Sequence, residues 1–218
     1  MNFKSIIKHG FKGYFSIFLL LQLFSFSSCE DEPKNKVIGL QTLNYFPDFY
    51  LDSISAAIHR CYGYDTYVMP NIKIPDSHFI KVKSPRYRAD SIINMLNERK
   101  PDSLAHILGL TCVDISVTKR DKLGRILKPV AFYTDWGVFG YGYVGKPGSV
   151  VSTFRVQGPN QKLVIDRMQK ISLHELGHNM GLPHCPNKNC FMRDAVESIK
   201  TVDKEGKTLC SDCKKKLR

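Results

Sequence analysis

The stretch His174–Met192 reads HELGHNMGLPHCPNKNCFM and contains three histidines, one glutamate and two cysteines. A hydrophobic core does not need so many metal-ligating side chains so close together, whereas a metal site does. His174 and His178 are four residues apart, so on a helix their side chains lie about 40° apart and one turn above each other. The spacing predicts two imidazoles that bind one zinc ion, on a helix that Gly158-Pro-Asn begins and Gly181 ends.

Glu175 and His184 complete the predicted site. Glu175 points further round the helix, so its carboxylate reaches a water on the metal without binding the metal itself. His184 returns after the turn at Gly181 as a third ligand, and the fourth position is left to a water whose pKa zinc lowers to about 7. The sequence thus predicts a hydrolase in which Glu175 takes a proton from the zinc-activated water and passes it to the leaving amine. The alternative is a helix with surface histidines, but HExxHxxGxxH fixes five positions and seldom arises by chance.

The cysteines form two close pairs joined by a longer span: Cys185 with Cys190, and Cys210 with Cys213 in a CSDC motif. This spacing is usual for a structural zinc site, in which four thiolates fill the coordination sphere and leave no position for catalysis. Two disulfides are the alternative, which an exported protein permits. Cys61 and Cys112 remain, either as buried apolar side chains or as one disulfide.

The residues from His174 to Cys213 resemble the archaemetzincin signature: HELGHNMGLPHC, then Cys190-Phe-Met, then CSDC. A weaker resemblance extends upstream to the strand near Val37, the aspartate of TCVDIS and VVSTFRV, and so covers most of residues 37–213. It implies an α/β fold: a compact single metzincin-like domain with a mixed twisted sheet, a long active-site helix and a zinc-bound C-terminal segment.

The same resemblance implies a zinc metallopeptidase that acts on a peptide or protein substrate and binds two zinc ions per chain. The implied ligands are His174, His178 and His184 for a catalytic zinc, and Cys185, Cys190, Cys210 and Cys213 for a structural zinc. Glu175 is the implied general base, and Met192 is expected beneath the catalytic zinc. Two rival functions stay open, a catalytically silent zinc-binding scaffold and a zinc hydrolase of a non-peptide amide, as does the choice between endopeptidase and aminopeptidase.

The N-terminus resembles an export signal. Residues 1–28 have three lysines among the first twelve positions, continue with the apolar run Phe15–Phe26 and end in two serines, which is typical of a signal peptide. The apolar run is too short to span a membrane. Small residues directly before Cys29 resemble a bacterial lipobox, which implies lipidation of Cys29, a membrane anchor and a place in the bacterial cell envelope. The acidic cluster Glu30–Glu32 resembles surface-export signals of some Bacteroidota lipoproteins and leaves surface exposure open. The alternative is a soluble secreted protein cleaved near Ser28.

Strands alternating with helices predict one α/β domain over residues 37–218, after a linker at residues 29–36. Strands are expected at residues 37–43, 66–69, 105–115, 138–144 and 149–156, and helices between Asp48 and Gly63, at residues 88–99 and at residues 158–180. The chain after Gly181 is expected to be irregular. Residues 138–144 are the candidate edge strand for binding an extended peptide by strand addition.

The remaining features point away from other functions. The net charge is +12, but the lysines and arginines are scattered and no nucleic-acid-binding motif stands out, so no nucleic-acid partner is expected. A basic soluble surface accounts for the charge. His59, His78 and His106 have no partner at ligand spacing and are expected to be structural or surface residues. The sequence gives no oligomeric state.

Overall fold

A computed structural model describes residues 36–194 and 198–217, which belong to one compact unit. The predicted signal peptide and Cys29 lie outside the described residues. The central sheet has the order β2-β1-β5-β9-β8. Its strands are β1 (Val37–Leu43), β2 (Asp65–Ile72), β5 (His106–Thr111), β8 (Gly140–Gly142) and β9 (Gly148–Ser152). All neighbours pair in parallel except β8, which runs antiparallel to β9 at one edge.

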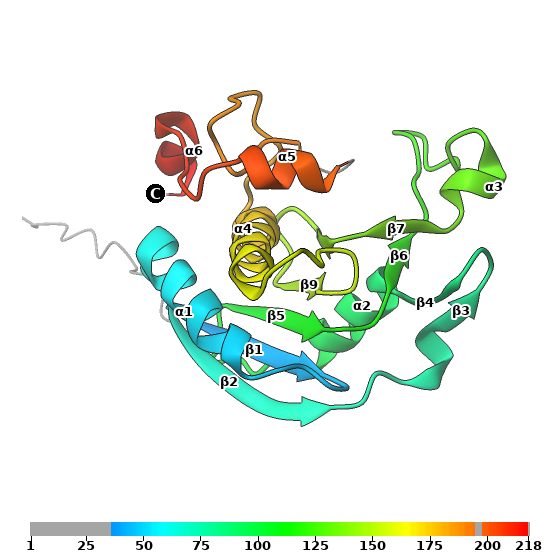
Figure 1. The fold of residues 1–218 in the computed structure, drawn as a ribbon, viewed down its shortest axis with the longest axis horizontal. Coiled ribbons are helices and arrows are strands. Elements are labelled where there is room, and N and C mark those ends of the chain that lie inside the picture. Colours follow the sequence, from blue (N-terminus) through cyan, green and yellow to red (C-terminus); the bar gives the residue numbers. More distant parts are fainter. Residues whose placement is uncertain (1–35, 195–197, 218) are drawn as a thin grey trace, which may run out of the picture. The chain divides into compact units, whose positions relative to one another are not determined.

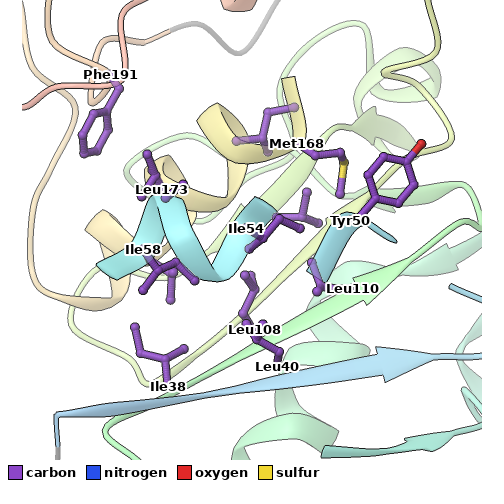
Figure 2. Packing of buried hydrophobic residues seen from close by; sticks show 14 of the residues in the cluster. Ile38, Leu40, Tyr50, Ile54, Ile58, Leu108, Leu110, Met168, Leu173 and Phe191 are labelled. Atoms are coloured by element: carbon purple, nitrogen blue, oxygen red, sulfur yellow. The ribbon is translucent and has the colours of Figure 1, made fainter. Parts of the chain in front are cut away.

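Helices cover both faces of this sheet (Figure 1). They are α1 (Phe49–Tyr62), α2 (Ala89–Arg99) and α4 (Gln161–Asn179). Successive side chains of a strand point to opposite faces, and accordingly Leu108 and Leu110 pack with α1 and α4 whereas Ile107 packs with α2. Figure 2 shows the first of these two cores, in which Ile54 of α1 and Met168 of α4 lie with Leu108. Helix α4, which carries the histidine motif, is therefore held by the core along its length.

A second sheet has the strand order β3-β4-β6-β7. In the sequence, its strands come between those of the central sheet. Its strands are β3 (Phe79–Lys81), β4 (Pro85–Arg88), β6 (Ile115–Val117) and β7 (Trp136–Val138), with the short helices η1 (Asp76–His78) and α3 (Val130–Tyr133) beside them. Asp114 connects two arginines here: its carboxylate accepts from Arg86 Nε at 2.8 Å and from Arg155 Nε at 2.6 Å. The three side chains form a partly buried ionic network where the chain passes from one sheet to the other.

Two helix ends agree with the sequence, whereas Asp48, expected to cap α1, makes no side-chain capping bond. Gly63 ends α1 with a left-handed φ of 71°, and the side chain of Asn160 accepts from the backbone N–H of Leu163 to begin α4. Gly181 follows α4 with φ 90°. Within the described residues, no helix is both long enough and apolar enough to cross a bilayer.

Several expected elements differ from the structure. The single strands expected at residues 105–115 and 138–144 are each two strands in different sheets, because the chain changes sheet at Asp114 and again at Phe139. Strand β2 is longer than expected and includes Pro70, which an edge strand tolerates, while β9 ends at Ser152. Two short helices, α5 (Ile199–Lys204) and α6 (Ser211–Lys216), replace the expected irregular C-terminal chain. Each has six residues and buries one side chain, so neither gives a periodic hydrophobic pattern.

Candidate metal centres

Helix α4 brings His174 and His178 together on one buried side. Their Nε2 atoms are 3.1 Å apart, and each residue is less than one-tenth exposed. The Nδ1 atom of His174 lies 2.7 Å from the carbonyl oxygen of Phe191, and that of His178 lies 2.8 Å from the carbonyl oxygen of Leu182. A carbonyl oxygen only accepts, so both Nδ1 atoms carry the proton and donate it.

This tautomer has a consequence for the other ring nitrogens. Burial lowers the pKa of His174 to about 3 and also lowers the pKa of His178, so both rings are neutral at pH 7. Both Nε2 atoms then present lone pairs to each other across 3.1 Å, which is repulsive unless a cation accepts them. A histidine whose Nδ1–H is held by a carbonyl is the usual form of a metal ligand. The donor set therefore fits a zinc ion.

His184 approaches the same point from the loop after α4. The left-handed Gly181 turns the chain back, and the ring centroid of His184 lies 5.3 Å from that of His174 and 4.9 Å from that of His178. The three rings offer nitrogens that all lie within 4.8 Å of one another. The His184 side chain is 41% exposed, and its Nδ1 lies 3.6 Å from a carboxylate oxygen of Asp194. His184 thus completes the predicted group of three histidines from the side that faces solvent.

Glu175 belongs to α4, and its side chain lies against the edge strand β8. The residue is 8% exposed, and burial raises the pKa of its carboxyl group to about 8. A Cβ atom at Gly140 would lie 2.8 Å from Glu175 Cγ and 2.9 Å from its Oε1, and a Cβ at Gly142 would lie 3.0 Å from the Glu175 carbonyl oxygen. Only glycines let β8 pass this close to the helix. This close approach was not predicted from the sequence, although Gly140 and Gly142, with one residue between them in GYG, were a visible signal.

The three histidines and Glu175 face a cleft of about 780 Å³. Strand β8 and the following residues to Val144 form one wall of it. Met192 is fully buried against Gly177 of the same helix, where a Cβ atom would lie 2.3 Å from its sulfur. Tyr62 supports the same turn by donating from its hydroxyl to the carbonyl oxygen of Leu173 at 2.6 Å. The helix turn that carries the histidines is thus packed against Met192 and supported by Tyr62, while the histidines face the cleft.

Four cysteines form a second group in the C-terminal segment: Cys185, Cys190, Cys210 and Cys213. Their sulfurs all lie within 4.8 Å of one another, and no disulfide joins them. The sulfurs of Cys185 and Cys210 are 3.7 Å apart, close to the spacing of about 3.8 Å between thiolates that each lie 2.3 Å from a tetrahedral zinc. The backbone N–H of Cys213 lowers the pKa of Cys210 to about 7, whereas burial raises the pKa of Cys190 and that of Cys213, which a bound cation would offset. The group therefore fits a closed thiolate site.

The other singled-out residues lie elsewhere. Cys61 and Cys112 are both free. Cys112 lies near Tyr50, at the start of α1, whereas Cys61 lies in the last turn of the same helix. The rise from Tyr50 to Cys61 along the helix axis is about 16 Å. The structure therefore separates them. His59, His78 and His106 belong to neither of the two clusters among the described residues. His59 lies 3.3 Å from Asp65 at the surface, and burial lowers the pKa of His106 to about 4.

The family model of Peptidase family M54 matches residues 50–218. The chain belongs to this family. A curated relative, the archaemetzincin of Haloquadratum walsbyi, is 31% identical over 172 residues, which cover 75% of this chain and 88% of the relative. The crystal structure of archaemetzincin from Methanopyrus kandleri superposes with a TM-score of 0.70 at 26% identity and covers 85% of this chain and 95% of its own. That of the Archaeoglobus fulgidus archaemetzincin complexed with malonate gives 0.65 at 25%, covering 83% and 99%.

Membership of family M54 confirms the resemblance that the sequence predicted, together with the single mixed α/β domain. The chain is accordingly a zinc-dependent metallopeptidase, a hydrolase that acts on peptides.

Proposed function

We propose that His174, His178 and His184 bind the catalytic zinc of this peptidase and that Glu175 is its general base. The observation that carries the proposal is the pair of buried Nε2 lone pairs 3.1 Å apart, which the ring of His184 faces from the loop. A bound zinc would polarise the peptide carbonyl and lower the pKa of a water at this site. Three ligands from the chain leave a position open for that chemistry.

Glu175 supplies the proton transfers. Its carboxylate takes the proton of the attacking water and then gives it to the leaving amine. Burial favours the protonated form of this side chain, since it raises the pKa to about 8, and a nearby dication favours the carboxylate. The two opposing influences keep the group able both to accept and to release a proton near neutral pH.

Strand β8 is the proposed support for the substrate backbone. It pairs with β9 along one edge and borders the cleft with the other. An extended peptide can add to such an edge through main-chain hydrogen bonds, which places its carbonyl groups along the wall beside Glu175. Gly140 and Gly142 bring this edge close to the catalytic group.

The four cysteines are proposed to bind a second, structural zinc, so that the chain holds two ions. Four thiolates complete the tetrahedral coordination and leave no open position, which suits a folding role. Of the C-terminal residues that the structure describes, those in the two short helices α5 and α6 are the only ones in regular elements. A metal site compensates for this small amount of regular structure.

We further propose that the protein is exported to the bacterial cell envelope and anchored by a lipid on Cys29. The support is the sequence of residues 1–32, in which a basic start, an apolar run, two serines, the cysteine and three acidic residues follow one another. Bacterial lipoproteins carry several acyl chains, which is sufficient for stable attachment.

Metal analysis combined with a peptide library tests the proposed peptidase site. Purified protein is assayed as isolated, after chelation and after zinc is restored. We expect cleavage that chelation abolishes and zinc restores. Protein that holds zinc but cleaves no peptide would instead support the catalytically silent scaffold. Hydrolysis of non-peptide amides alone would support the zinc hydrolase of a non-peptide amide.

A further inference from the structure

A small pocket adjoins the main cleft, with which it shares Gly140, His174 and Glu175. Its volume is about 40 Å³, enough for a few water molecules. The side chains of Phe139, Ile171 and Val202 make its walls apolar, and the charged side chains of Glu175, Glu205 and Lys170 also line it. The pocket is thus small and has apolar walls, two carboxyl groups and one ammonium group.

Glu205 lies in this pocket without a counterion. It is 7% exposed, and its Oε1 atom is buried and has no hydrogen-bond partner. Among the described residues, no lysine or arginine nitrogen forms an ion pair with it. The nearby Lys170 Nζ forms an ion pair with Asp166 Oδ2 at 2.8 Å. It also donates hydrogen bonds to the carbonyl oxygens of Val202 and Asp203 at 3.1 and 3.3 Å.

A buried carboxylate without a partner is unfavourable. Burial accordingly raises the pKa of Glu205 to about 7, although the positive charges of Arg193 and Lys170 oppose this rise. A cation that entered the pocket would supply the missing partner. The apolar walls suit the methylene groups at the end of a lysine side chain, and a pocket of about 40 Å³ admits only this end and its ammonium group.

The chemistry proposed for Glu175 indicates which substrate residue reaches the pocket. Glu175 gives its proton to the leaving amine, so the residue that bears this amine lies beside Glu175 during the reaction. The pocket is bordered by Glu175 and by His174, whereas His178 and His184 line only the main cleft. The side chain of the residue after the scissile bond would therefore be the one that can reach the pocket.

We propose that Glu205 makes the enzyme select a basic side chain, with lysine as the fitting example, in the residue directly after the scissile bond. This selectivity rests on the proposed function of Glu175 and the histidine site. A charge-assisted hydrogen bond in a buried position corresponds to a preference of about ten- to a hundredfold.

The kinetic test uses peptides that differ only in the residue after the scissile bond, which is lysine or its uncharged analogue norleucine. We expect kcat/KM to favour lysine by about ten- to a hundredfold in the wild type and by less than about twofold in Glu205→Gln, which keeps the shape of the side chain and removes its charge. The control is Glu98→Gln, the same change at an exposed position of α2, which should retain the wild-type ratio. Equal rates in the wild type, or a preference that Glu205→Gln retains, would overturn the proposal.

A binding test separates this selectivity from turnover. The same peptides, labelled with a fluorophore, are titrated by anisotropy against Glu175→Gln protein with and without Glu205→Gln. Tighter binding of the lysine peptide that depends on Glu205 supports the pocket assignment, and equal binding refutes it. If the wild type cleaves neither peptide but the lysine peptide still binds more tightly through Glu205, the proposed catalytic function fails while the recognition stands.

Discussion

Replacement of Gly140 by alanine should impair catalysis without removing zinc. The added Cβ would lie 2.8 Å from Glu175 Cγ, whereas ordinary contact begins at 3.4 Å, so the side chain has to recede by about 0.6 Å, the difference of the two. The same methyl would lie 2.9 Å from Ile171 Cγ2, so it would press on α4 at two points one turn apart. A misplacement of about 1 Å can cost a reaction about a hundredfold, and we expect kcat/KM to fall by about ten- to a hundredfold.

The strain should also appear as lost stability. Overpacking costs about 1–3 kcal/mol, which for a chain of this length lowers Tm by about 2–4 °C per kcal/mol. The assay measures kcat/KM, zinc content and Tm for the wild type, Gly140→Ala and the control Gly206→Ala, whose new methyl would meet nothing closer than 3.8 Å. Activity within twofold of the wild type, or zinc loss equal to the loss of activity, would show that the close approach of β8 does not position Glu175.

The remaining predictions concern the proposed ligands and the anchor. Glu175→Ala should keep its zinc but lose about 10²–10⁴-fold in peptide hydrolysis, whereas His178→Ala should lose both zinc and activity; a cleavage rate of Glu175→Ala equal to wild type would reject the general base. Native mass spectrometry should find two zinc ions per chain, with the closed cysteine site more resistant to chelators; one zinc together with two disulfides would contradict this. Cys29→Ala should abolish labelling by a fatty acid, and equal labelling of wild type and mutant would exclude the lipid anchor.

The sequence was sufficient where the determinants are local. Residues four apart on a helix share a face, so HExxH already places His174 and His178 together, and the ring of His184 follows once Gly181 reverses the chain. The ends of α1 and α4 were likewise predictable, because Gly63 and Asn160 act on their own neighbours in the chain. The fold class followed from the family signature and from the alternation of strands and helices.

The sequence was insufficient where the determinants are distant contacts. A continuous β-rich segment such as residues 138–144 does not reveal that its two halves belong to different sheets, since the change of partner is set by the pairing of Ile115 with Val138 and of Gly140 with Val151. The same holds for Glu205, which follows a six-residue helix and would be read as a surface glutamate. Its position beside Glu175 depends on the packing of α5 against α4.

The two proposed zinc sites are joined by one segment of backbone. His184 and Cys185 are consecutive, and the N–H of Cys185 donates to the carbonyl oxygen of Met192 at 2.7 Å, which closes the segment between them into a loop. The carbonyl oxygen that orients His174 belongs to Phe191, the neighbour of Cys190. Groups that orient a metal-binding histidine typically change metal affinity by about 10–100-fold. Thiolates that fix this loop would therefore also fix the tautomer and direction of His174, so the structural site would be part of the catalytic site rather than a separate support.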